Sequence, residues 1–355
     1  MSRGHFGLLV GAATMFLAAC APAASEPSAD TRTGGTSAAS EPQVREVATG
    51  LTSPWGLVAL SDGSTLVSER DTRRIVHLVD GDATPVRTID DARPAGEGGL
   101  LGLAVSKDQQ TVFAYYTAES DNRLVSMSWD GNALGEPAVI LRGIPKGGRH
   151  NGGRLALGPD GYLYIGTGET GDGGLAQDKT SLGGKILRIT TAGQPAPGNP
   201  FGNEVYSYGH RNVEGLAFDE EGRLWASELG DQAWDELNLI TMGGNYGWPQ
   251  VEGSSQTRDL INPKVVWTTS EASPSGLAYW QGKLWMAALR GQQLWEIPLE
   301  GSTPGQPRGH FTDTYGRLRS VTVTADGNNL LLSSSNTDGR GNENPGDDRL
   351  LSLAG

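Results

Sequence analysis

A histidine in a glycine-rich segment is the first candidate for chemistry. Residues 147–155 read GGRHNGGRL and place His150, one of five histidines in the chain, between two arginines and four glycines. An imidazole has an unperturbed pKa of about 6.5, which suits it to accept a proton near neutral pH. Glycine also lets a ligand approach the backbone closely. The segment therefore predicts either a general base beside a bound ligand or an exposed loop histidine.

Three arginines late in the sequence form a second candidate group. They are Arg290, Arg317 and Arg319. A guanidinium fork matches a carboxylate bidentately, so converging arginines would bind a small ligand that carries several negative charges. The alternative is that they lie on the surface and pair with some of the 41 acidic residues.

An oxygen-rich stretch is the candidate metal site. Residues 227–249 read SELGDQAWDELNLITMGGNYGWP and include Glu228, Asp231, Asp235 and Glu236. Calcium takes about six to eight oxygen ligands and accepts irregular loops, although the spacing is not that of an EF-hand. One cysteine and no paired histidines argue against zinc. We therefore expect Ca²⁺ here.

A repeated phrase identifies the elements that must position these residues. It consists of an apolar strand, a turn that usually contains Asp-Gly or Glu-Gly, and a second apolar strand, which is the pattern of a β-hairpin. Copies begin at Gly56, Gly102, Arg154, Gly215, Gly276 and Ser320, with spacings of 46, 52, 61, 61 and 44 residues. This is the scale of a propeller blade, whereas a β-sandwich with insertions has no reason to repeat one hairpin. We predict an all-β, six-bladed β-propeller with four-stranded antiparallel blades over residues 44–355.

The candidate residues occupy the flanks of these hairpins. In an antiparallel hairpin, the residue before the first strand and the residue after the second strand lie at the same end. The residues before first strands are Glu97, His150, Arg211, Asn212, Arg317 and Arg319, and those after second strands are Glu169, Glu228, Gly230, Asp231, Arg290 and Asn336. We expect these residues to meet at one mouth of the central channel. Charges scattered over polar loops are the alternative.

The N-terminal segment indicates export. It begins MSRGHFGLLVGAATMFLAAC, a short basic part, an apolar run and small residues, which is typical of a secretory signal. The last four residues also resemble a bacterial lipobox, which predicts a lipoprotein signal peptide at 1–19 and a lipid on Cys20; an ordinary signal peptide is the alternative. Residues 20–43 are rich in Ala, Ser, Pro and Thr and predict a disordered tether.

Charge and cysteine content restrict the partners. The formal net charge of −13 argues against a nucleic-acid partner, and a single cysteine allows no internal disulfide. We expect a protein exported to the outer face of the bacterial cell membrane, or to the periplasm, that meets the membrane only through a lipid anchor at Cys20.

Five motifs resemble those of a known family, the soluble PQQ-dependent glucose and aldose sugar dehydrogenases, where PQQ is pyrroloquinoline quinone. The motifs are GEGGLLGLA (96–104), GGRHNGGRLALGPDGYLYIGTGE (147–169), AQDKTSLGGKILRI (176–189), YGHRNVEGLAF (208–218) and DELNLITMGGNYGWP (235–249). The similarity runs in order from about Leu51 to Leu353. It implies a six-bladed propeller that binds PQQ and Ca²⁺ at one mouth and oxidises the anomeric carbon of aldoses.

The resemblance also implies residue roles. His150 is similar to the general base that takes the proton of the sugar C1 hydroxyl while the hydride passes to C5 of the quinone. Arg211 and Asn212 resemble the pair that hydrogen-bonds the reacting quinone oxygens. The remaining implied cofactor contacts are Glu97, Arg290, Arg317, Arg319 and Asn336. The implied metal ligands are the carbonyls of Gly230 and Asp231 for the cofactor Ca²⁺, and Glu236 with the backbone of Tyr246 for a second, structural Ca²⁺.

Three positions depart from the glucose-oxidising members of that family. Glu97 replaces a glutamine, Arg149 replaces an acid before the histidine, and Asp231 stands where proline is frequent. The GGRH form resembles the aldose-type branch instead, so we expect Arg149 to influence substrate choice.

Three functions follow as hypotheses. The first is a PQQ- and Ca²⁺-dependent aldose dehydrogenase that passes electrons to an external acceptor such as a quinone, a small redox protein or a dye, because the chain has no haem-attachment Cys-x-x-Cys-His. The second keeps the fold and cofactor but oxidises a sorbosone-like sugar aldehyde or a polyol. The third is a non-catalytic propeller lipoprotein that binds a ligand at the same mouth.

Overall fold

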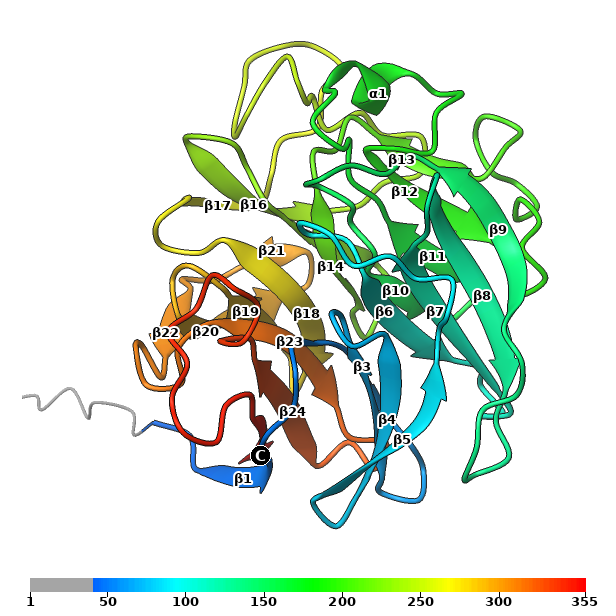
Figure 1. Ribbon diagram of the computed structural model, residues 1–355. Helices are drawn as coiled ribbons and strands as arrows, with labels where there is room; N and C mark the ends of the chain where they lie inside the picture. Colours follow the sequence, from blue (N-terminus) through cyan, green and yellow to red (C-terminus); the bar gives the residue numbers. More distant parts are fainter. Residues whose placement is uncertain (1–40) are drawn as a thin grey trace, which may run out of the picture. The chain divides into compact units, whose positions relative to one another are not determined.

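Each copy of the repeated hairpin forms the first two strands of one blade. The computed structural model describes residues 41–355, which form six antiparallel sheets around a central axis (Figure 1). The predicted six-bladed β-propeller is thereby confirmed. The predicted signal peptide and residues 20–40 of the predicted tether lie outside the described residues.

The strands of the first three blades have the following bounds. Blade 1 consists of β2 (Pro54–Ala59), β3 (Thr65–Glu69), β4 (Arg74–Val79) and β5 (Asp82–Thr88). Blade 2 consists of β6 (Leu100–Val105), β7 (Thr111–Thr117), β8 (Asn122–Ser128) and β9 (Ala138–Ile144). Blade 3 consists of β10 (Leu155–Leu157), β11 (Leu163–Gly166), β12 (Lys185–Ile189) and β13 (Val205–Tyr208), with the short helix α1 (Gly174–Gln177) in its β11–β12 loop.

The last three blades vary more. Blade 4 consists of β14 (Val213–Phe218), β15 (Leu224–Glu228), β16 (Trp234–Leu239) and β17 (Val265–Thr268). Blade 5 consists of β18 (Pro274–Trp280), β19 (Lys283–Ala288) and β20 (Gln293–Glu300), with β21 (Thr303–Pro304) and β22 (Arg308–His310) both paired to β20. Blade 6 consists of β23 (Leu318–Val323), β24 (Asn329–Ser334), β25 (Leu350–Ala354) and β1 (Val44–Ala48).

The two ends of the described chain close the ring. The N-terminal strand β1 pairs antiparallel with the C-terminal strand β25, with Val44 opposite Leu353, so β1 lies beside the C-terminus in Figure 1. The first strands of the blades contact one another in the order β2, β6, β10, β14, β18, β23 and back to β2. This closure leaves no free edge at the inner strands.

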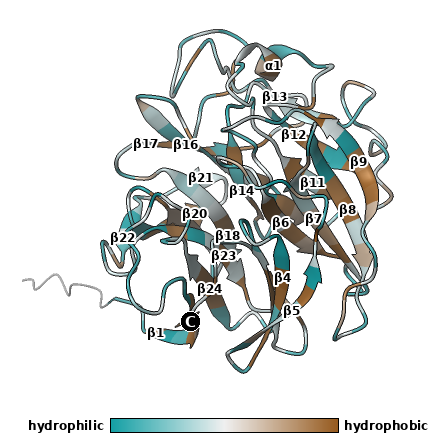
Figure 2. Cartoon of the chain, in the orientation of Figure 1, coloured by the Kyte–Doolittle hydropathy of each residue, from teal (hydrophilic) through white to brown (hydrophobic). Residues whose placement is uncertain are grey.

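Apolar side chains between blades hold the ring together. Six clusters of buried residues lie one at each junction between neighbouring blades, for example Leu66, Val112 and Val125 between blades 1 and 2. Figure 2 shows apolar residues concentrated in the strands and hydrophilic residues in the surrounding loops. Close approach at the axis requires glycine, because a Cβ at Gly56 would lie 2.7 Å from the backbone nitrogen of Leu103 in the next blade.

The described part of the chain has little helix. Within residues 41–355, no helix combines the length and apolarity needed to cross a membrane.

Candidate active site

The strand register brings the hairpin flanks to one end of the propeller. Pro54 at the start of β2 pairs with Glu69 at the end of β3, and Val213 at the start of β14 pairs with Glu228 at the end of β15. A cavity of about 330 Å³ opens at this end, near the lower limit of small-molecule sites. We call this end of the propeller the mouth.

Arginines dominate the wall of the cavity. The charged residues that line it are Arg70, Arg290, Arg317, Arg319, Arg340, Glu97, Glu214 and Asp338. Five guanidinium groups against three carboxylates leave an excess of positive charge. Of the predicted cofactor contacts, Glu97, Arg290, Arg317 and Arg319 are therefore brought together as expected.

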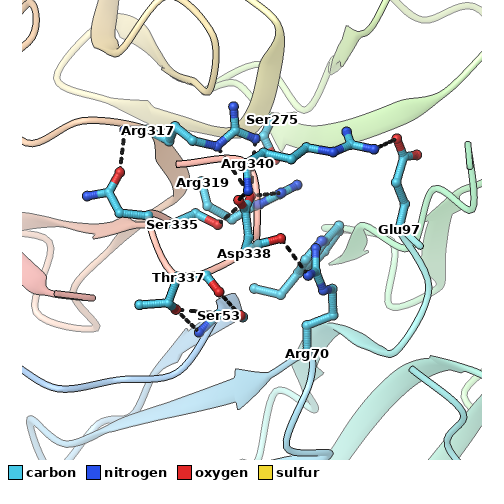
Figure 3. A network of polar contacts seen from close by, with 12 residues as sticks. Ser53, Arg70, Glu97, Ser275, Arg317, Arg319, Ser335, Thr337, Asp338 and Arg340 are labelled. Atoms are coloured by element: carbon cyan, nitrogen blue, oxygen red, sulfur yellow. Dashed lines mark hydrogen bonds and ion pairs between the residues drawn. The ribbon is translucent and has the colours of Figure 1, made fainter. Parts of the chain in front are cut away.

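Asp338 and Glu214 hold the predicted arginines in place. Asp338 Oδ2 accepts hydrogen bonds from Arg317 Nη2 at 3.1 Å and from Arg319 Nη2 at 3.3 Å (Figure 3). Arg319 Nη1 also donates to Glu214 Oε2 at 2.7 Å. Burial raises the pKa of Asp338, but the charges of Arg319 and Arg317 outweigh this effect and hold the pKa below its usual range.

Some guanidinium nitrogens at the mouth still lack acceptors. Arg319 Nε and Arg154 Nη2 are buried without a hydrogen-bond partner among residues 41–355. Both guanidinium groups lie over Trp55, with Cζ 5.8 Å from the ring centroid for Arg319 and 4.2 Å for Arg154. Burial lowers the pKa of Arg154 to about 9. Because a buried unpaired donor is costly, these groups fit a ligand that supplies anionic oxygens.

His150 is oriented by two carboxylates. Its Nδ1 lies 2.5 Å from Glu169 Oε1, and its backbone N–H donates to Glu97 Oε2 at 2.7 Å. An ionised carboxylate can only accept, so Nδ1 carries the proton and the neutral ring presents Nε2 as its basic nitrogen. Asn151 and Gly152, the next two residues, line the cavity. This arrangement can remove a proton from a ligand next to the arginines.

A buried lysine positions the loop that carries Glu169. Lys185 Nζ donates to the carbonyls of Leu175 at 2.6 Å, Ala176 at 3.0 Å and Gly183 at 2.7 Å. These bonds fix the loop between β11 and β12, and Glu169 lies near the start of that loop.

Arg211 and Asn212 begin blade 4 beside His150. Arg211 Nη2 donates to Asp231 Oδ1 at 2.8 Å, and its Cζ lies 5.3 Å from the Trp248 ring centroid. Its Nε is buried without a partner within the described range 41–355. Asn212 makes two hydrogen bonds inside the protein, because Oδ1 accepts from the Gly152 N–H at 2.9 Å and Nδ2 donates to Glu214 at 3.2 Å. Within residues 41–355, the second N–H of Nδ2 stays available to a ligand.

A smaller cavity adjoins the first and brings the predicted metal ligands together. It measures about 10 Å³, the space of roughly one water-sized sphere, and Leu229 lines both cavities. Gly230, Glu236 and Tyr246 line the smaller cavity, whereas the side chain of Asp231 pairs with Arg211. The smaller cavity therefore gathers residues that the sequence assigned to two ions.

Two carboxylates face each other at this smaller cavity. Glu228 on β15 and Glu236 on β16 are direct cross-strand neighbours. Burial, and to a smaller extent the charge of Glu228, raises the pKa of Glu236 to about 8. Asn238 Oδ1 nearby is buried without a partner among the residues described. Carboxylate, amide and carbonyl oxygens are calcium-type ligands, and a cation would relieve the repulsion. No group of three or more His, Cys, Asp or Glu side chains in residues 41–355 is arranged to hold a metal, so backbone carbonyls would have to contribute.

The structure adds residues that the sequence pattern did not single out. Arg70 follows Glu69 at the end of β3, which is the same flank that identified Glu169 and Glu228, so the hairpin register could have found it. Asp338 and Arg340 lie in the long loop between β24 and β25, where no register applies.

Asn336 lies at the mouth but turns into its own loop. Its Nδ2 donates to the Tyr315 carbonyl and to Asp347 Oδ2, both at 3.0 Å, and its Oδ1 accepts from the Arg317 N–H at 2.9 Å. Its side chain therefore supports Arg317 and does not line the cavity.

Comparisons with known proteins identify the family. The sequence profile described as Glucose / Sorbosone dehydrogenase matches residues 51–342. The PQQ-bound aldose sugar dehydrogenase of Streptomyces coelicolor is 52% identical and has a TM-score of 0.85, covering 89% of this chain and 99% of that one. An aldose sugar dehydrogenase of Escherichia coli is 28% identical over 81% of this chain and 88% of its own length. Quinoprotein glucose dehydrogenase B of Acinetobacter calcoaceticus is 31% identical over 57% of this chain and 51% of its own length.

The profile spans most of the propeller, and the similarity to the Streptomyces coelicolor structure extends over nearly all of that protein. The resemblance recognised in the five motifs is confirmed. The chain belongs to the glucose/sorbosone dehydrogenase family of oxidoreductases.

Proposed function

We propose that this protein oxidises aldose sugars at C1 to the lactone, with PQQ as cofactor and Ca²⁺ as its metal, and passes the electrons to an external acceptor. The observation that carries the proposal is the pairing at the mouth of an arginine-lined cavity with a carboxylate-oriented histidine. The Streptomyces coelicolor relative, similar over nearly its whole length, is a PQQ-bound aldose sugar dehydrogenase.

The arginines suit the acidic cofactor. PQQ carries three carboxylates and a quinone, and the cavity offers five arginines, one of which, Arg319, has a buried nitrogen unpaired within residues 41–355. Arg290, Arg317 and Arg319 would hold the carboxylates, while the unpaired Nε of Arg211 is available for a quinone oxygen. Glu97 and Asn212 would complete the surroundings of the cofactor, and Asn336 would act only through its support of Arg317.

His150 would act as the general base. Its Nε2 accepts the proton of the sugar C1 hydroxyl, and Glu169 stabilises the imidazolium that forms. Arg211 and Asn212 stabilise negative charge that develops on the acceptor. When bound, PQQ supplies the C5 carbonyl that accepts the hydride from C1.

Calcium would bind beside this chemistry. The carbonyls of Gly230 and Asp231 would hold the cofactor ion, and Glu236 with the Tyr246 backbone a second one; the raised pKa of Glu236 supports a cation near that carboxylate. A bound Ca²⁺ supplies Lewis-acid polarisation of a carbonyl oxygen.

The substrate and the cellular location extend the proposal. Arg149 is exposed and directly precedes His150, so it is available to contact a sugar. We further propose export with a lipid on Cys20, which mass spectrometry of the mature N-terminus would test.

Reconstitution tests the enzyme function. Cofactor-free protein is mixed with PQQ, Ca²⁺ or both, and reduction of an acceptor dye is followed over a panel of aldoses, sugar aldehydes and polyols. Dye reduction by aldoses only when both are present supports the proposal. Preference for a sorbosone-like aldehyde or a polyol would replace the substrate class. A PQQ absorbance spectrum that stays unchanged on mixing, with Ca²⁺ present, would contradict cofactor binding.

A further inference from the structure

The backbone of His150 adopts a conformation that must be held by its surroundings. Its φ is +53°, in the left-handed region that a residue with a Cβ adopts at a cost. The Glu97 carboxylate accepts a hydrogen bond from the His150 N–H at 2.7 Å, and the His150 carbonyl accepts one from the Thr170 N–H at 3.2 Å. Glu97 therefore makes the side-chain contact that fixes the backbone from which the imidazole projects.

The second oxygen of the Glu97 carboxylate accepts a hydrogen bond from an arginine of another blade. Arg340 Nη2 donates to Glu97 Oε1 at 2.9 Å, across 243 residues of sequence. Glu97 precedes blade 2 and Arg340 follows the second strand of blade 6, and blade 1 lies between these two in the ring. The ion pair thus bridges two blades that are not neighbours in the ring, and Figure 3 shows Arg340 extended toward Glu97.

Arg340 is itself tied to the arginine cluster. Its backbone N–H donates to Asp338 Oδ1 at 2.9 Å, and the other oxygen of Asp338 accepts from Arg317 and Arg319. A continuous series of polar contacts therefore runs from the arginines that face the cavity, through Asp338 and Arg340, to Glu97 (Figure 3). The Glu97 carboxylate continues the series to the backbone N–H of His150.

We propose that Arg340 and Glu97 are positioning residues that connect the anion-binding arginines to His150. Arg340 holds the Glu97 carboxylate against the His150 amide, and Asp338 holds the Arg340 loop against Arg317 and Arg319. The arrangement rests on the proposed function for its catalytic consequence, but the physical link exists in the protein without cofactor.

Hydrogen–deuterium exchange in the cofactor-free protein tests the link directly. Arg340→Met removes the ion pair from an exposed side chain, so the fold should be retained. The matched control is Arg142→Met on β9, because Arg142 is exposed and has no polar partner among residues 41–355. We expect faster exchange in the peptide containing residues 147–153 for Arg340→Met, and wild-type exchange for Arg142→Met.

Kinetics of the reconstituted enzyme test the consequence. At saturating PQQ and Ca²⁺, Arg340→Met should lower kcat by about ten- to a hundredfold, the scale of a misplaced catalytic group, with little change in KM for the aldose. Arg340→Lys should restore part of the loss, because an ammonium can still pair with Glu97. Glu97→Gln keeps an oxygen for the His150 amide but removes the charge that holds Arg340. The double variant with Arg340→Met and Glu97→Gln should therefore have a kcat no lower than that of the more impaired single variant.

The outcomes separate this inference from the proposed function. Unchanged exchange at residues 147–153, an unchanged kcat in Arg340→Met, or fully additive losses in the double variant would each overturn the link. A loss confined to PQQ affinity would make Arg340 a cofactor contact only and would also overturn it. If wild-type protein shows no PQQ-dependent activity, the proposed function fails, while the exchange experiment still decides the link.

Discussion

The two ends of the same six hairpins use acidic residues in opposite ways. At the turn end, aspartates accept the backbone N–H two residues later, a local turn-forming bond. These pairs are Asp62 with Ser64, Asp108 with Gln110, Asp160 with Tyr162, Asp219 with Glu221 and Asp326 with Asn328. At the mouth, Glu97, Glu214 and Asp338 instead bind arginines, and Glu214 reaches Arg319 across 105 residues.

Two carboxyl groups, one at each end, have pKa values shifted in opposite directions. The Ser64 hydroxyl holds the pKa of Asp62 below its usual range, whereas burial and Glu228 raise the pKa of Glu236 to about 8. Acids at the turn end are satisfied within their own blade, by the turn and in two cases also by an arginine, namely Asp160 by Arg188 and Asp219 by Arg223. Acids and arginines at the mouth remain partly unsatisfied, which suits a ligand and an ion.

The largest contrast between the two ends should appear in catalysis. His150→Ala removes the base at the mouth, so kcat of the reconstituted enzyme should fall by about 10²- to 10⁴-fold, the usual share of general-base catalysis. Steady-state dye reduction at saturating PQQ and Ca²⁺ measures it. Near-normal turnover in this variant would remove His150 from the mechanism.

Ion pairs at the two ends should differ in their effect on stability. Arg319→Met leaves Glu214 and Asp338 buried with fewer partners and should lower the free energy of unfolding by about 3 kcal/mol. This is the lower end of the range for broken buried ion pairs, because Ser275 still contacts Glu214 and Arg317 still contacts Asp338. Arg223→Met at the turn end removes a more exposed guanidinium, and Asp219 keeps hydrogen bonds from Trp225 and from the backbone, so its loss of stability should be smaller. Urea unfolding of cofactor-free protein measures both, and equal losses would remove the contrast.

Glu236 and Asp62 should contribute to the pH dependence of stability with opposite signs. With metal chelated, Glu236 has a folded pKa of about 8 against an ordinary value of 4.5, so between these values the folded state binds a proton that the unfolded state does not. Its contribution therefore makes stability fall as pH rises from about 4.5 to 8. Asp62, whose pKa is lowered, loses its contribution only as pH falls below its ordinary value of 3.8.

Glu236→Gln isolates that contribution. The variant should lose part of the decrease in Tm between pH 5 and pH 8 that chelated wild-type protein shows. Added Ca²⁺ should raise Tm of the wild type more at pH 8 than at pH 5, because binding needs the ionised carboxylates. An identical pH slope in wild type and variant would contradict the assignment.

The smallest effect is expected at a single turn. Asp62→Ala removes the acceptor for the Ser64 N–H and hydroxyl, at 2.9 and 2.6 Å, and should cost about 1 kcal/mol of stability. Thermal unfolding measures this loss, and kcat should be unchanged because the turn lies at the far end of the hairpin. A substantial fall in kcat would show that the two ends are not independent.

The contrast also explains what the sequence could predict. Hairpins with Asp-Gly or Glu-Gly turns are local, so the six blades and the side on which Glu97, His150 and Arg211 gather followed from strand direction alone. Partners such as Glu214 for Arg319 or Arg340 for Glu97 depend on which blades meet across the mouth, and no local pattern records that. The pairing of β1 with β25 is similarly hidden, because the two strands lie at opposite ends of the chain.

The closure of blade 6 has a consequence for biosynthesis. The strand β1 is made before every other strand of the propeller but pairs with β25, which is made after all of them, so the ring cannot close until β25 has been made. The cavity draws Glu97 from an early blade and Arg317, Arg319 and Arg340 from the last one. An interrupted chain that ends before Arg317 can therefore contain folded blades and yet lack the cavity, so ligand binding would report complete translation of the propeller.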